Sequence, residues 1–313
     1  MAESIVDEYL RRDPATSIRV SVTGGRGALF VSGDVVTTAD FDVASVIRRT
    51  LSSNGILTEI EPFVSLEPAT PDLSSFMISG NVSPTHVVGY ATDETSEYLP
   101  RPVVIARQVV ELFERQRTQN EQWFWFGSDA EVVVTDTGKQ IQIHVALEHG
   151  QEELASVRKQ IAQILQPLFP TASIRVNTLG SISFRGLGNV MGASGQRMSI
   201  YGDQLPSGPS PVGLHPGHPE KGGMWLARLA AKDLVMHEYA KQALVQFVYD
   251  PGERVPSMIR ARDSQGTDLS AFVDPERYSL EGLVGPWLAP GLSTASARFG
   301  FVGLPDAPWE TGG

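Results

Sequence analysis

The short run His215-Pro-Gly-His218-Pro-Glu220 offers nitrogen and oxygen atoms that could hold a metal ion or an anion. Imidazole and carboxylate groups are ligands that zinc prefers. The prolines, however, prevent a helical face that would present both rings together, and no further clear ligand accompanies the run. By ligand count, a metal site at His215, His218 and Glu220 is therefore not favoured from these residues alone.

Glycine-rich segments supply further candidates. Gln196 and Arg197 directly follow Gly192-Ala-Ser-Gly195, and Arg197 is the cation that we expect to contact a ligand. Asp34 follows Gly33 in a predicted hairpin, where an aspartate is either ordinary turn chemistry or a cation ligand. A dinucleotide loop at Gly186-Leu-Gly188 is not expected, because neither a βαβ unit nor a downstream ribose acid accompanies it.

The elements that must position these residues form an internal repeat of two strands followed by a helix. We predict three such units: strands over 17–22 and 28–33 with a helix over 41–51, strands over 130–134 and 140–145 with a helix over 152–168, and strands over 244–248 and 257–261 with a weaker helix over 275–287. The sequence therefore predicts an α+β protein with three similar β-β-α lobes around a pseudo-three-fold axis. We place an N-terminal lobe at 1–101, a central lobe at 102–223 and a C-terminal lobe at 224–313.

Two long helices, over 102–117 and 224–244, are predicted to connect successive repeats. Residues 202–223 are so rich in glycine and proline that we expect a long loop there, either a surface excursion or a lid.

Composition limits the function. The chain has 313 residues, 41% of them hydrophobic and 19% charged, with a net charge of -11. This acidic balance argues against nucleic acid or an anionic membrane as the partner. Neither a transmembrane span nor a signal peptide is recognisable, so we expect a cytoplasmic protein. The absence of cysteine excludes disulfides and thiolate chemistry.

Short sequence motifs along most of the chain resemble those of the S-adenosylmethionine synthetase family. The strongest match is Gly89-Tyr-Ala-Thr-Asp-Glu-Thr95 with Leu99-Pro100 beyond it, which is similar to the family's best-known heptapeptide region. Four further stretches follow in family order: Val31-Ser-Gly33-Asp34, Gly192-Ala-Ser-Gly195, Ala227-Arg228-Leu-Ala-Ala-Lys232 and the tail Pro308-Trp309-Glu310. We interpret the chain as a divergent member of this family.

The resemblance implies a fold of three lobes and a reaction in which methionine sulfur attacks the ribose of ATP and triphosphate leaves. Mg²⁺ held by carboxylates, together with several cationic side chains, would stabilise that leaving group. The family's His-Pro-Asp-Lys segment is absent, because the residues that follow Met1 resemble only the end of the helix after it. The family's acid for the methionine amino group falls at Ala44 or Ser45, a second substrate acid falls near Ser83, and the ribose acid falls near Val190.

The resemblance also suggests roles for individual residues. Phe184 stands where the family places an aromatic ring against adenine, and Asp34 where it has an acid near a monovalent cation. A family lysine two places after Asp129 is Glu131 here, and Gln196 replaces an arginine. His218 replaces the lysine of a Lys-x-Asp-Arg element. Our ligand-binding candidates are Phe184, Arg197, Gln196, Asp129, His218 and Glu220, with Glu220 and Asp34 the candidate metal ligands.

These losses lead us to expect a repurposed protein that binds S-adenosylmethionine or another small substrate in specialised metabolism and does not make S-adenosylmethionine. S-adenosylmethionine or ATP is the expected ligand, and a role for Mg²⁺ is not favoured. A genuine methionine adenosyltransferase and a non-catalytic partner subunit of a complete synthetase remain alternatives, so catalysis itself stays open. The resemblance implies a homodimer with the pocket at the interface.

Overall fold

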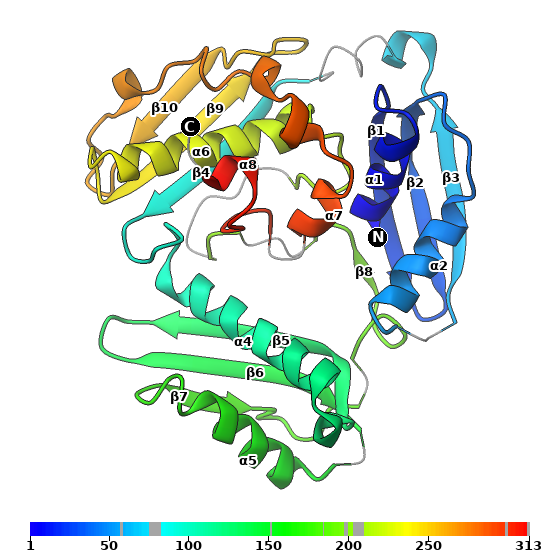
Figure 1. The fold of residues 1–313 in the computed structure, drawn as a ribbon, viewed down its shortest axis with the longest axis vertical. Helices are drawn as coiled ribbons and strands as arrows, with labels where there is room; N and C mark the ends of the chain where they lie inside the picture. Colours follow the sequence, from blue (N-terminus) through cyan, green and yellow to red (C-terminus); the bar gives the residue numbers. More distant parts are fainter. Residues whose placement is uncertain are drawn as a thin grey trace.

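The computed structural model describes residues 1–56, 59–74, 83–150, 152–183, 185–196, 200–202, 210–297 and 300–311. In this part of the chain three sheets surround the centre of the molecule, each in its own lobe (Figure 1). The strand orders are β3-β2-β1-β8, β5-β6-β7 and β10-β9-β4. The predicted α+β fold with three similar lobes is confirmed.

The first lobe is built on the hairpin of β1 (Ser17–Gly25) and β2 (Ala28–Val36), with β3 (Glu61–Pro68) parallel to β2. The helices α1 (Ala2–Arg12) and α2 (Val43–Ser53) contribute buried apolar residues to the same cluster as the inward residues of these strands. Along β1 the alternation puts Ile18, Val20 and Val22 into this core and leaves Arg19 exposed. The period of two thus fixes which face of β1 can meet a ligand.

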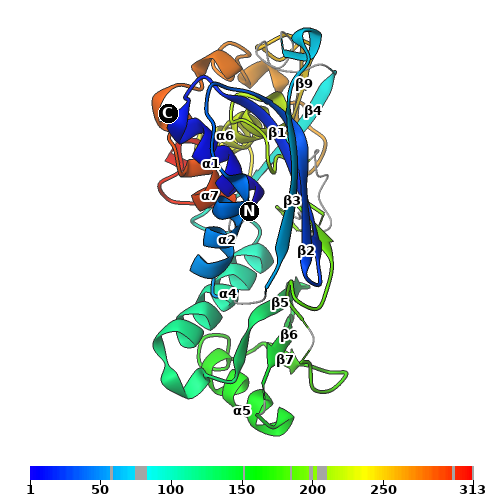
Figure 2. The ribbon, with the colours of Figure 1, turned by 90° about the vertical axis from the view of Figure 1, so that its right-hand side faces the viewer.

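The second lobe contains β5 (Phe126–Asp136), β6 (Ile141–His149) and β7 (Ser173–Val176). The helices α4 (Arg101–Gln119) and α5 (Leu154–Leu165) pack on one face of this sheet through Val109, Phe113 and Ile161, which are fully or almost fully buried. Figure 2 shows α1, α2, α4 and α7 (Leu292–Ala297) on one side of the molecule and β1, β2, β3, β5, β6 and β7 on the other. The first two lobes therefore turn sheet faces in the same general direction.

The third lobe pairs β9 (Gln242–Tyr249) with β10 (Met258–Arg262) and with β4 (Thr85–Thr92). β4 comes from the stretch that we assigned to the N-terminal lobe, so the third sheet joins distant parts of the chain. The helix α6 (Met224–Met236) packs across β4 and β9. Gly89 permits this contact, because a Cβ atom there would lie 2.0 Å from the carbonyl carbon of Ala227. The lobe boundaries at 101 and 223 stay predictions.

Two predicted helices differ from the structure. The helix expected over 224–244 ends at Met236, and Glu238 has a positive φ of 60° before β9 begins at Gln242. No α-helix covers the described residues 275–287, where the short 3-10 turns η4 (Leu280–Gly282) and η5 (Gly285–Leu288) lie instead. This stretch contains four glycine or proline residues, which interrupt a continuous helix.

Candidate functional site

Residues 210–223 lie along β1 and position the candidate site. Val20 N–H donates to the Gly213 carbonyl at 2.8 Å, and His215 N–H donates to the Ile18 carbonyl at 3.0 Å. Gly213 has a φ of +79°, and a Cβ atom there would lie 1.9 Å from the Val20 carbonyl oxygen. Only glycine suits this close approach. The expected loop over 202–223 therefore ends as a strand-like attachment to β1, followed by the buried π-helical turn η2 (Pro219–Gly223).

The two histidines use the same ring nitrogen in the same way. His215 Nδ1 accepts from Gly217 N–H at 2.9 Å, and His218 Nδ1 accepts from Glu220 N–H at 3.2 Å. The second bond caps the start of η2. His215 is therefore neutral and carries its proton on Nε2 when this bond is made. In His218 the bond at Nδ1 competes with Arg19 Nη2, a donor 3.1 Å from Nε2, because a neutral ring has a single lone pair. Binding a metal through Nε2 of either ring would leave the proton on Nδ1, where it would face a backbone donor.

Arg19 reaches this corner from β1. Its Nη2 lies 3.1 Å from His218 Nε2 and 3.9 Å from Glu220 Oε1. In the strand register Arg19 is the direct partner of Asp34 on β2, and directly opposed residues project from the same face of a sheet. The structure thus brings His218 and Glu220 to one guanidinium group and places Asp34 on the same face of the sheet, opposite Arg19. Their roles as ligand contacts stay predictions.

Burial and positive charge determine protonation here. Burial, together with the cation of Arg19, lowers the pKa of His218 to about 3. Burial also lowers the pKa of His215 to about 4, with Lys221 and Arg254 adding to the effect. The pKa of Glu220 is raised by burial and partly held down by Arg19. At neutral pH the corner therefore contains two neutral imidazoles beside the Arg19–Glu220 pair.

Gln196 lies farther along β1, beside the two-residue strand β8 (Gly192–Ala193). Ala193 pairs with Thr23, and Gln196 Oε1 accepts from Ala193 N–H at 3.2 Å. Thr23 is four residues beyond Arg19, about 13 Å along a strand. The amide of Gln196 thus closes its own turn, well removed from His218.

Asp129 is connected to the β1–β2 turn, at the end of β1 away from Arg19. Its Oδ2 accepts from Arg185 Nε at 3.2 Å and from Gly186 N–H at 2.9 Å, while Glu131 accepts from Arg185 Nη2 at 2.9 Å. The loop that follows Arg185 reaches the β1–β2 turn, where Arg26 Nε donates to the Asn189 carbonyl at 2.7 Å. The candidates are therefore spread along β1.

Phe184 and Arg197 lie outside the described residues. Among the residues that are described, no group of three or more histidine, aspartate and glutamate side chains is arranged to hold a metal ion. Nor does any helix in this part of the chain have the length and apolar character needed to cross a membrane.

Lys221 occupies the last position of the run His218-Pro-Glu-Lys221 and points into the protein. It is fully buried and bonds to the Glu3 carboxylate, to the Leu214 carbonyl at 3.0 Å and to Ser293 Oγ at 3.0 Å. These three acceptors use all three donors of the ammonium group. Burial raises the pKa of Glu3 and lowers the pKa of Lys221, and the opposite charge of each partner offsets this. This lysine fixes α1 to the candidate loop.

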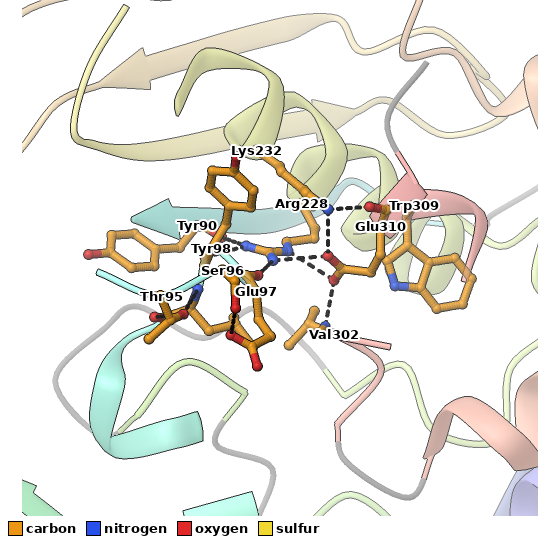
Figure 3. Close-up of polar contacts among 12 residues, drawn as sticks. Tyr90, Thr95, Ser96, Glu97, Tyr98, Arg228, Lys232, Val302, Trp309 and Glu310 are labelled. Carbon is orange, nitrogen blue, oxygen red and sulfur yellow. Dashed lines mark hydrogen bonds and ion pairs between the residues drawn. The ribbon is translucent and has the colours of Figure 1, made fainter. Parts of the chain in front are cut away.

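Arg228, from the stretch similar to the family, holds the heptapeptide and the tail together (Figure 3). Its Nε and Nη2 donate to the two Glu310 oxygens at 3.1 and 3.0 Å. Nη1 donates to the Tyr90 and Tyr98 carbonyls at 2.7 and 2.9 Å, and Nη2 donates also to the Glu97 carbonyl at 2.7 Å. All five guanidinium donors are used. Gly89 and Arg228, which both lie in stretches that resemble the family, thus have roles in packing.

Sequence reasoning missed Arg19, Arg185 and Glu3. Arg19 did carry a signal, as the charged residue on the outward face of a strand whose inward face is apolar. Arg185 and Glu3 carried none, because their partners lie 54 or more positions away in the chain.

Known proteins match this chain from end to end. A family model for the central domain of S-adenosylmethionine synthetase matches residues 80–182. The S-adenosylmethionine synthases of Deinococcus deserti and Staphylococcus epidermidis are each 24% identical to it, in alignments that cover 99% of this chain and 91% and 90% of those proteins. A solved structure described as an unusual S-adenosylmethionine synthetase from Campylobacter jejuni superimposes with a TM-score of 0.81 at 20% identity, covering 99% of this chain and 91% of that one.

The two kinds of match support each other: the central model covers the heptapeptide region and the second lobe, and the full-length alignments extend to both ends. The chain is a distant member of the S-adenosylmethionine synthetase family.

Proposed function

We propose that this protein binds S-adenosylmethionine or a related adenosyl compound and does not make S-adenosylmethionine. One observation carries the proposal: three of the described cations near the candidate site already lie beside carboxylates of the same chain. Arg185 is paired with Asp129 and Glu131, Lys221 with Glu3, and Arg19 lies beside Glu220.

Release of triphosphate needs preorganised positive charge that is free to meet the leaving group. Lys221 cannot supply it, because removing the partner of a buried ion pair costs about 3–5 kcal/mol. Two carboxylates lie 3.2 Å and 2.9 Å from Arg185 nitrogens. The three groups together carry a net negative charge, which repels a polyanion. A ligand that has no triphosphate fits this electrostatic setting better than ATP does. We do not assign a reaction to the bound compound.

Calorimetric titration tests the proposal. We expect saturable binding of S-adenosylmethionine with one site per chain, and weaker binding of ATP. Incubation with ATP, methionine and Mg²⁺ should give no S-adenosylmethionine. Product formation at ordinary enzyme rates would establish the genuine adenosyltransferase instead, while no binding of S-adenosylmethionine or ATP, together with co-purification of a complete synthetase, would favour the partner-subunit role.

A matched pair of variants tests the electrostatic reason. Glu131→Lys removes a carboxylate from Arg185 and adds a cation, so tripolyphosphate should bind about tenfold or more tightly than to the wild type, by the usual effect of a nearby charge. Glu121→Lys makes the same charge change at an exposed position of η1 (Glu121–Trp123). It should leave tripolyphosphate binding unchanged, and equal effects of the two variants would contradict the reasoning.

A further inference from the structure

The family implies Mg²⁺, and the side chains around Arg19 decide whether a divalent ion fits the candidate carboxylates of this chain. Glu220 and Asp34 are the candidate ligands, with His218 as the nearest nitrogen donor. A neutral imidazole has one lone pair, and in His218 it accepts either from Glu220 N–H at Nδ1 or from Arg19 Nη2 at Nε2. Neither tautomer leaves a lone pair free for a metal, so the donor set is reduced to the carboxylates, of which Glu220 lies beside Arg19.

The Arg19 guanidinium occupies the position beside Glu220 where a metal ion would bind. Its Nη2 is 3.9 Å from Glu220 Oε1 and 3.1 Å from His218 Nε2. Asp34 is its strand partner and projects from the same face of the sheet, but the printed contacts of the guanidinium are with His218 and Glu220, so Glu220 is the carboxylate that it pairs with. A divalent ion at Glu220 would have to approach this fixed positive charge at close range, where like charges oppose each other strongly. The residues present do not fit Mg²⁺.

We propose that Arg19 is a resident counter-cation that replaces a divalent metal ion at Glu220. The guanidinium balances the charge of this carboxylate, so the corner needs no metal to accept a ligand. An arginine is suited to this, because it stays protonated at any physiological pH and cannot dissociate from the protein. The inference concerns the cation alone and does not depend on which compound the pocket binds.

Three variants separate charge from side-chain size. Arg19→Ala removes the counter-cation and leaves Glu220 and His218 without it. Arg19→Lys keeps a positive charge at the same position. Arg48→Ala is the matched control, because Arg48 is an exposed arginine of the same lobe that lies 3.5 Å from Glu61. Circular dichroism and thermal unfolding show whether each variant is folded, and Arg19→Gln replaces the alanine variant if that one is not.

Mn²⁺ is the probe, because its electron paramagnetic resonance signal reports the free ion directly. Wild-type protein, Arg19→Lys and Arg48→Ala should bind Mn²⁺ only weakly. Arg19→Ala should bind one Mn²⁺ per chain about tenfold or more tightly, the size of effect that one adjacent charge produces. Adding Glu220→Gln to Arg19→Ala should abolish the gain.

Two results overturn the proposal. One is tight Mn²⁺ binding by the wild type that Glu220→Gln removes, which would mean that the corner is a metal site with Arg19 in place. The other is an Arg19→Ala protein that is folded and gains no Mn²⁺ affinity, which would mean that Arg19 does not stand in for a metal. Neither result depends on S-adenosylmethionine, so a failure here is distinct from a failure of the proposed function.

Discussion

Single residues at the start of η2 make the candidate site sensitive to acid. His215 and His218 are neutral because burial and the cations Arg19, Lys221 and Arg254 oppose their protonation. Each ring also accepts a backbone hydrogen bond that a protonated ring would lose. Protonating either histidine therefore removes a local hydrogen bond within residues 215–220, directly after the point where the chain attaches to β1.

The pH dependence of stability follows from these two rings. Their folded pKa values, about 4 and about 3, lie below the unfolded value of 6.5. The unfolded chain thus binds more protons between these values, and stability is fully present above pH 6.5 and falls as the pH falls towards the folded pKa. At pH 5 the loss is at most about 2 kcal/mol per ring.

Urea unfolding at pH 7 and pH 5 measures this loss. We expect His215→Gln/His218→Gln to lose less stability over this interval than the wild type does. His86→Gln changes an exposed histidine and serves as the control. An unchanged pH dependence in the double variant would show that the acid sensitivity arises elsewhere.

At the scale of elements, α6 is the helix on which the third lobe is assembled. It crosses β4 at Gly89 and presents Arg228 to the heptapeptide and to Glu310 of α8 (Pro308–Thr311). Trp225 of the same helix stacks on Trp309 with ring centroids 4.0 Å apart. One helix thus connects two strands, a turn and the tail.

Arg228→Met should destabilise the protein by about 3–5 kcal/mol, since it leaves Glu310 charged and buried without its main partner. Arg228→Met/Glu310→Met should recover much of this loss, because replacing a buried pair by apolar side chains is often close to neutral. Chemical unfolding of the single and double variants measures the coupling. Equal stability of Arg228→Met and the wild type would refute the buried-pair account.

The predictable part of the fold was local. Alternation of apolar residues identified β1, β2, β5, β6, β9 and β10, because each hairpin partner is close in the sequence. The pairing of β4 with β9 left no local signal, since strand partners are chosen by tertiary packing. The same limit applies to the site: His218 and Glu220 are neighbours and were found together, whereas Arg19 meets them only after residues 210–223 attach to β1.

At the scale of the whole molecule, the outward face of the first sheet carries exposed aromatic side chains. Phe30 of β2 and Phe63 of β3 are 51% and 52% exposed and stack with their ring centroids 5.2 Å apart. Exposed apolar groups of this size are common at interfaces. The resemblance implies a homodimer with the pocket at the interface, and we propose that two copies pair through these faces.

Multi-angle light scattering tests this pairing. Wild-type protein should have twice the mass of the 33.9 kDa chain, and Phe30→Ser/Phe63→Ser should shift it towards the single chain. Phe124→Ser, at a site that is 85% exposed, is the control for surface polarity alone. A wild type that is monomeric at all accessible concentrations would exclude a homodimer.

The sheet that joins β4 to β9 also sets the order in which a newly made chain can fold. Thr85 pairs with Tyr249, so β4 must wait for a partner made roughly 150 residues later. At about 5–20 residues per second a ribosome needs roughly 8–30 seconds to supply it. The second lobe, which lies entirely between these strands, can fold in that interval. Until then the backbone groups of β4 are unpaired and its apolar side chains are uncovered. We expect chaperones to bind the nascent chain at this strand.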